Sequence, residues 1–147
     1  MMWGGIAANR RTDLVAINGS LNAQRYRNEI LIPHVLPFIA ANGGTFQQDN
    51  ARPHVARANL DFLRLNNVDV LPWPVLSPDL SPIEHLWDQL DRQIRRRQQQ
   101  PETLAQLRTA LQEEWQQIPM ASINRLIASM RRRCQAVIDN RGSFTRY

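Results

Sequence analysis

The stretch F-Q-Q-D-N-A-R-P-H occupies residues 46–54, and W-P-V-L-S-P-D-L-S-P-I-E-H-L-W occupies residues 73–87. Each stretch places one carboxylate at the edge of a predicted element, because Asp49 ends a short strand and Glu84 lies in the first turn of a helix. The 34 residues 50–83 separate them. If folding brings two such carboxylates together, their hard oxygen atoms suit a divalent metal ion.

Each carboxylate also has a purely structural interpretation. Asp49 and Asn50 are residue types that form turns, here ahead of a helix that Pro53 would begin. Ser81 and Glu84 have the spacing of a capping box, in which the glutamate serves only the start of its helix. For either residue alone, the structural interpretation is favoured over catalysis.

Composition bounds the class of protein. The length of 147 residues and the 43% hydrophobic content suit one globular domain. No apolar run approaches a membrane span, and the N-terminus lacks the pattern of a signal peptide. We therefore expect no membrane partner and no secretion; the location would be the nucleus in a eukaryotic host and otherwise intracellular. The single cysteine, Cys134, is expected to pack in the core, and no zinc-site spacing exists.

The basic side chains favour a nucleic-acid partner. All 18 lysine-or-arginine positions are arginine, and the formal net charge is +5. Guanidinium groups suit bidentate contacts to phosphate. Solvated helix faces would explain the same charges equally well. The runs 95–97 and 131–133 are expected to point largely outward, toward DNA or toward solvent.

Hydrophobic periodicity predicts strands that alternate with helices, then a helical tail, which is typical of an α/β domain around a mixed sheet. The predicted strands, of which the first two form a hairpin, span residues 1–8, 12–17, 45–49 and 68–71. A helix over residues 21–32 should be broken or kinked by Pro33 and Pro37. Another helix should begin at Pro53, and a rigid proline-rich loop should cover residues 72–82.

The later helices are predicted from their apolar stripes. The side chains expected to face inward are Val55, Ala58, Phe62 and Leu65 after Pro53; Ile83, Leu86, Trp87, Leu90 and Ile94 after Pro82; Leu104, Leu107, Leu111 and Trp115; and Ile123, Ile127, Met130, Cys134 and Val137. Near Glu84, we interpret Asp79 as a residue that caps a loop and Asp88 as a solvated helix residue.

Taken together, the two opening stretches resemble the second and third catalytic blocks of mariner-superfamily transposases. The 34-residue gap is similar to that of the worm-element branch. The similarity continues in W-G-G-I from Trp3, N-A-Q-R-Y from Asn22 and R-R-R-C-Q-A from Arg131, and so covers essentially the whole chain. One departure is Ser81, where the family commonly has asparagine, and serine also caps helices.

The resemblance implies a ribonuclease-H-like α/β fold, with a mixed sheet flanked by helices and a helical C-terminal tail. It also implies a catalytic triad of two aspartates and a glutamate, in which Asp49 matches the second aspartate and Glu84 the glutamate. In the family these side chains hold Mg²⁺ or Mn²⁺ for attack on a phosphodiester. The implied partners are transposon-end and target DNA and a second copy in a homodimer. The candidate DNA contacts are Arg52, His54, His85, Arg95, Arg96 and Arg97.

The first aspartate of the family lies upstream of the W-G-G-I strand, and Asp13 does not match it. We therefore expect residues 1–147 to be one partial catalytic domain without its first, central strand, without a helix-turn-helix region, and inactive by itself. Two alternatives stay open. In the first, the chain is a non-catalytic DNA-binding module derived from a transposon. In the second, it is a transposon remnant without a role.

Overall fold

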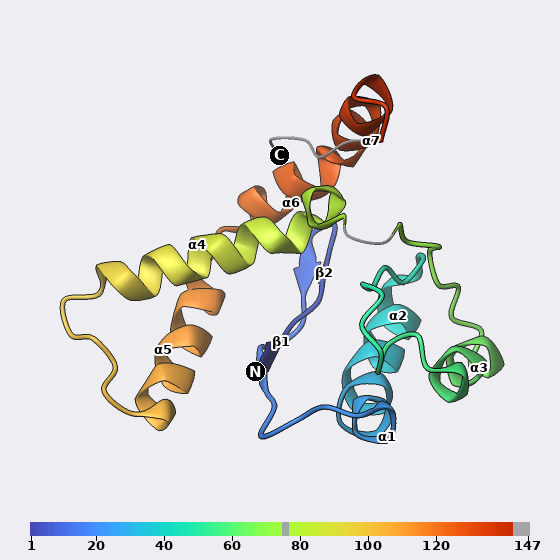
Figure 1. Ribbon diagram of the computed structural model, residues 1–147. Helices are drawn as coiled ribbons and strands as arrows, with labels where there is room; N and C mark the ends of the chain where they lie inside the picture. Colours follow the sequence, from blue (N-terminus) through green and yellow to red (C-terminus); the bar gives the residue numbers. More distant parts are fainter. Residues whose placement is uncertain (75–76, 143–147) are drawn as a thin grey trace. The chain divides into compact units, whose positions relative to one another are not determined.

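The computed structural model describes residues 1–74 and 77–142, and its chain divides into two compact units (Figure 1). The first unit comprises Met1 and Ile17–Leu76, and the second comprises Met2–Ala16 and Ser77–Tyr147. Part of the predicted proline-rich loop, residues 75 and 76, lies outside the described residues. No helix in the described part of the chain combines the length and the apolar character that a bilayer span requires.

The second unit begins with the predicted hairpin. Strand β1 (Met2–Trp3) pairs antiparallel with β4 (Val15–Ala16). Strand β2 (Ile6–Ala7) pairs antiparallel with β3 (Arg10–Arg11). Asn9 makes the turn with a φ of 62°, a conformation that asparagine tolerates better than most residues. A side chain at Gly4 would lie 3.2 Å from the Trp115 ring, so glycine lets the tryptophan pack against the hairpin.

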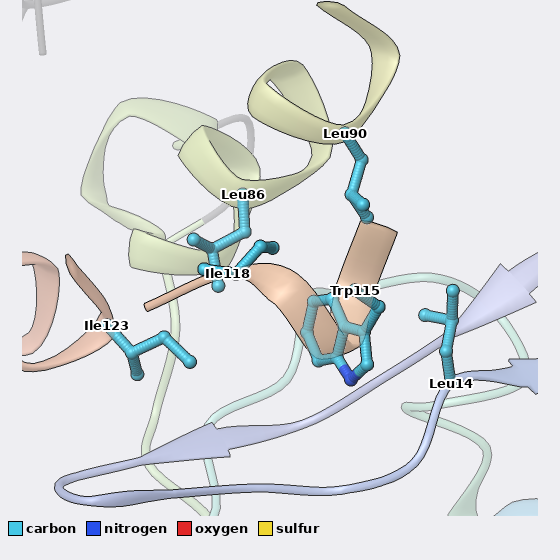
Figure 2. Close-up of a cluster of buried hydrophobic side chains, with 6 residues drawn as sticks. All are labelled: Leu14, Leu86, Leu90, Trp115, Ile118 and Ile123. Carbon is cyan, nitrogen blue, oxygen red and sulfur yellow. The ribbon is translucent and has the colours of Figure 1, made fainter. Parts of the chain in front are cut away.

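Helices complete this unit and share one core with the hairpin. The elements are η2 (Pro78–Leu80), α4 (Pro82–Arg96), α5 (Leu104–Gln117), α6 (Met120–Ala128) and α7 (Met130–Asp139). Figure 2 shows the core side chains Leu14, Leu86, Leu90, Trp115, Ile118 and Ile123. The Trp115 ring stacks on Trp87 with centroids 5.6 Å apart, and its Nε1 donates to the Thr12 carbonyl at 2.8 Å. The predicted inward stripe of α4 is confirmed at Leu86, Leu90 and Ile94.

The end of α5 is closed by a residue far away in the sequence. The Arg11 guanidinium donates to the carbonyls of Trp115 and Ile118 through Nη1 and to that of Gln116 through Nη2, at 2.6, 2.7 and 2.6 Å. Carbonyls in the last turn of a helix have no partner within the helix, so this arginine satisfies them. The contact also ties the hairpin to α5.

The last predicted helix is wrong in two respects. It is two helices, because the chain bends at Ser129, whose amide bonds back to the carbonyls of Arg125 and Leu126. The new start changes which face of α7 is covered, so Cys134 is exposed and Arg133 is buried. The expected burial of Cys134 and the expected outward direction of Arg133 are both wrong.

The expected inward direction of Leu104 is also wrong. This side chain is 75% exposed, because Leu104 is the first residue of α5.

We expect Thr103→Ala to destabilise the chain by about 1 kcal/mol. Thr103 and Gln106 form a capping box at the start of α5, with the threonine hydroxyl accepting from the Gln106 amide at 3.2 Å. The substitution removes the acceptor for that amide. Urea denaturation measures the change, and Thr109→Ala, at an exposed site in the same helix, should shift the midpoint less.

The first unit is built on a continuous helical segment formed by α1, η1 and α2, with the bounds Ala23–Tyr26, Arg27–Val35 and Leu36–Asn42. The helix was expected to be broken or kinked at Pro33 and Pro37, and it is not broken at either residue. Pro33 lies inside the π-helical stretch η1, whose altered hydrogen-bond register accommodates a residue that has no N–H to donate. Pro37 lies in the first turn of α2, directly after this stretch, where the helix changes from the π to the α type. Gly43, with a φ of 66°, ends the segment.

Helix α3 (Arg57–Leu65) begins later than predicted and presents a different face. Residues 52–54 form a turn, so Pro53 does not start the helix. Asn59 and Leu63 are buried, whereas Leu65 is 80% exposed, and the predicted inward face is therefore wrong. The late start shifts which residues meet α1. The predicted strands 45–49 and 68–71 are reduced to one parallel bridge, between Phe46 and Val70.

Candidate active-site carboxylates

Asp49 lies on an exposed loop that follows the Phe46 bridge. Its side chain is 68% exposed, and its Oδ1 accepts from the Ala51 amide at 2.9 Å and lies 2.5 Å from Nδ1 of His54. The amide contact confirms the turn-forming role expected of this aspartate. That role leaves most of the carboxylate facing solvent, so the turn and a function in metal binding are compatible.

A buried network supports this loop from α1. The Tyr26 hydroxyl donates to Oε1 of Gln48 at 2.8 Å, and Nε2 of Gln48 donates to the His54 carbonyl at 3.2 Å. The Tyr26 and His54 rings also contact each other, with centroids 4.2 Å apart. The amide of Asn59 donates to the Pro53 carbonyl at 2.8 Å. The loop that carries Asp49 is therefore held by buried side chains of α1 and α3.

The stability of the chain should decrease at alkaline pH because of Tyr26. Burial of the phenol and, to a lesser degree, the charge of Asp49 raise the pKa of Tyr26 well above its ordinary value of 10.0. Above about pH 10 the Tyr26 phenol is deprotonated in the unfolded chain but keeps its proton in the folded chain. The free energy of unfolding should then fall as the pH rises above about 10, and this group should have no effect at lower pH.

Tyr26→Phe tests this expectation. The variant should lose about 1–3 kcal/mol at neutral pH, because Oε1 of Gln48 loses its buried donor. It should also show a smaller decrease in stability above pH of about 10, since the titrating phenol is gone. Urea denaturation across this pH range measures both effects. An alkaline decrease as steep as that of the parent chain would contradict the assignment to Tyr26.

Glu84 lies in the first turn of α4 and is exposed. The Ser81 side chain makes no capping hydrogen bond, so the predicted capping box is wrong. Pro82 occupies the start of the helix, and η2 leads directly into it. A carboxylate at this position is favoured by the helix dipole.

His85 is half-buried beside Glu84 in the sequence. Partial burial lowers the pKa of His85, and the positive charges of Arg133 and Arg92 lower it further, while Asp88 acts in the opposite direction. Its imidazole is therefore biased toward the neutral form. Asp88 is exposed and pairs with Arg92 at 2.9 Å, which confirms the expected solvated residue.

The arginine run at the end of α4 divides between exposure and ion pairing. Arg95 and Arg96 are exposed as expected, and Nε of Arg95 pairs with Asp91 at 2.7 Å. Arg97 is only partly exposed, and its guanidinium pairs with Glu113 and Glu114 of α5, both at 2.7 Å. Arg97 thus joins α4 to α5, a role that local sequence reasoning missed. In the first unit, Arg52 is exposed on the loop of Asp49.

The two candidate carboxylates belong to different units, Asp49 to the first and Glu84 to the second. No group of three or more acidic, histidine or cysteine side chains is arranged to hold a metal ion among residues 1–74 and 77–142. The donor chemistry nevertheless fits Mg²⁺ or Mn²⁺, because both side chains are exposed carboxylates with hard oxygen atoms.

The family model described as "DDE superfamily endonuclease" matches residues 7–108, a region that contains both Asp49 and Glu84. The chain belongs to the DDE superfamily endonucleases. Its relatives among curated proteins identify it more closely as a DDE endonuclease domain of the Tc1/mariner transposase type, which confirms the resemblance drawn from the motifs.

These DDE relatives are transposases of nematode transposable elements. The chain is 38% identical over 152 residues to the Tcb1 transposase of Caenorhabditis briggsae and 38% identical over 152 residues to the Tc1 transposase of Caenorhabditis elegans. It is 30% identical over 149 residues to the Tc3 transposase of Caenorhabditis elegans. All of this chain is covered in each case, but only 54%, 54% and 45% of the relative. The chain spans about half the length of these DDE relatives.

Solved structures confirm the fold of this DDE domain at a coarse level. The crystal structure of the Mos1 mariner transposase catalytic domain matches with a TM-score of 0.76 and 21% identity, over 99% of this chain and 81% of that one. The Mos1 mariner paired-end complex with Mn matches with a TM-score of 0.76 and 26% identity, over 89% of this chain and 40% of that one. The described chain is thus mixed α/β and resembles this ribonuclease-H-like catalytic domain, as predicted.

Proposed function

We propose that this chain is the catalytic part of a transposase that cuts DNA at the ends of an element and joins them to target DNA. The observation that carries the proposal is the placement of Asp49 and Glu84. Each is an exposed carboxylate beside a regular element, and 34 residues lie between them within the region of the family match. The Mos1 relative is described as a strand transfer complex and as a paired-end complex with a transposon end, which supports DNA as the partner.

Asp49 and Glu84 would hold Mg²⁺ or Mn²⁺, the ions with which Mos1 catalytic-domain structures are described. When bound, such ions activate the attacking oxygen and stabilise the leaving oxygen of a phosphodiester. His54 contributes by holding Oδ1 of Asp49 in a fixed direction, since its own ring is supported by Tyr26. This arrangement orients the carboxylate before any ligand arrives.

The arginines supply a second part of the proposal. Exposed Arg52, on the loop of Asp49, and exposed Arg96, at the opposite end of α4 from Glu84, would neutralise backbone phosphates. Arg95 and Arg97 already pair with acidic residues, so they would contact DNA only by exchanging those partners. A second copy of the chain, and a nuclear location in a eukaryotic host, are proposed from the family likeness alone.

The proposed chemistry needs a third carboxylate, which the family places before the strand of Trp3. The intact mass of the endogenous product, read together with the reading frame upstream of Met1, therefore accompanies the activity test. A product that carries an additional strand with an aspartate supports cleavage. A product that begins at Met1 favours the alternative, a non-catalytic DNA-binding module.

The direct test is a cleavage and strand-transfer assay of the endogenous product on DNA that carries the ends of its own element. We expect nicked and joined products with Mg²⁺ or Mn²⁺ and none with a chelator. DNA binding without cleavage in either metal, weakening steeply with salt, would overturn the catalytic proposal in favour of the binding module.

A further inference from the structure

We propose that Arg133 of α7 is a positioning residue for Glu84: it holds in place the turn from which α4 begins. The inference rests on the proposed function of Glu84 as a metal-binding carboxylate. It names a residue 49 positions further along the chain on which the placement of that carboxylate depends.

Arg133 is only 1% exposed, less than any other buried polar or charged residue of the second unit. Its Nε donates to Oγ of Ser129 at 2.8 Å, and its Nη1 donates to the carbonyl of Asp79 at 2.6 Å. Burying a guanidinium is costly unless its donors are satisfied, and bonds from a charged donor are among the strongest in proteins. A buried arginine with these partners therefore fixes the backbone at Asp79.

The Asp79 carbonyl belongs to the segment that places Glu84. Asp79 lies in the middle of η2, and this turn leads through Ser81 directly into α4. Turn hydrogen bonds join the segment, from the Ser81 amide to the Pro78 carbonyl at 2.9 Å and from the Glu84 amide to the Ser81 carbonyl at 3.3 Å. A constraint on Asp79 is thus passed to the first turn of α4.

The N-cap residue of α4 does not supply this constraint. The Ser81 hydroxyl makes no capping hydrogen bond, although Ser81 is buried. The anchor comes from the α6–α7 junction, where the Ser129 hydroxyl donates to the Leu126 carbonyl at 2.6 Å and accepts from Arg133. The bend at Ser129 is what turns Arg133 inward, so the helical tail sets the start of α4.

The test compares Arg133→Met with Arg132→Met, which changes the neighbouring exposed arginine of the same helix. In hydrogen–deuterium exchange of the whole chain, Arg133→Met should speed exchange of the amides at residues 80–86 about tenfold, and Arg132→Met should not. Binding of Mn²⁺ followed by electron paramagnetic resonance should weaken about tenfold in Arg133→Met only. Arg133→Lys, which keeps a charged donor, should restore part of both.

Unchanged exchange at residues 80–86 in Arg133→Met would overturn the inference, and so would faster exchange with unchanged Mn²⁺ affinity. If Arg133→Met fails to fold, Ser129→Ala decides, because it keeps the guanidinium and removes the acceptor of Nε, together with the donor to the Leu126 carbonyl. It should show the same pattern of faster exchange and weaker Mn²⁺ binding, with smaller changes. Glu84→Gln tests the proposed function separately. Mn²⁺ affinity that is unaffected by Glu84→Gln would overturn both that function and the inference that rests on it.

Discussion

Asp49→Asn and Glu84→Gln should each reduce metal-dependent DNA cleavage by about 10³-fold or more, while DNA binding stays within about twofold of the parent. Each substitution removes the charge of one proposed metal ligand and leaves the shape of the side chain unchanged. Charge stabilisation by a bound metal contributes several kcal/mol to such reactions, which corresponds to a rate factor of this size. The measurement is single-turnover cleavage of element-end DNA by the endogenous product, with binding followed by fluorescence anisotropy.

Matched controls separate this effect from a general loss of charge. Asp69→Asn in the first unit and Glu102→Gln in the second each neutralise an exposed acidic residue outside the two motifs. Both controls should cleave DNA at the parental rate. Cleavage by Asp49→Asn or Glu84→Gln at more than about a tenth of the parental rate would contradict the assignment of these carboxylates to the metal.

Trp115→Ala should reduce the free energy of unfolding by about 3–5 kcal/mol. The ring is 0% exposed, lies at the centre of the second unit's core and stacks on Trp87. The substitution leaves a large cavity and also removes the donor to the Thr12 carbonyl, which holds the hairpin. Since small domains are stable by about 5–15 kcal/mol, a loss of this size would unfold a substantial part of the population.

Urea denaturation followed by circular dichroism measures this change. The control is Leu104→Ala in the same helix, where the side chain is exposed, and it should cost less than about 1 kcal/mol. A Trp115→Ala variant that loses less than about 1 kcal/mol would show that the hairpin and the helices do not depend on this core contact.

The regular parts of the fold could be predicted because they depend on local pattern. The apolar stripe of α4 identifies its buried face, and the strand patterns at residues 1–8 and 12–17 identify the hairpin. The candidate site could be predicted only from the two motifs together. Asp49 alone is predicted to form a turn, and in the structure its side chain does accept from the Ala51 amide.

Several predictions failed, one through a local change of helix type and others because a distant residue decides the outcome. Pro33 was expected to break or kink its helix, and the helix is not broken there but continues as a π-helical stretch. The capping box at Ser81 and Glu84 has the right spacing but is not formed, and the start of α4 is held from Arg133 instead. Arg97 was expected to point outward with Arg95 and Arg96, but it forms ion pairs with two glutamates of α5.

The sequence by itself determined the family, the hairpin and the helix that carries Glu84, and it proposed the two candidate carboxylates, because motif spacing and hydrophobic period are local properties of the chain. Only the tertiary structure decided that Arg133 is buried and that Cys134, its neighbour, is exposed. The physical reason lies at Ser129, where a bend resets the helical register and the buried hydroxyl and the Asp79 carbonyl become partners for a guanidinium. A periodic sequence pattern cannot predict the Asp79 carbonyl as a partner of Arg133, because it belongs to a turn 54 residues away in the chain.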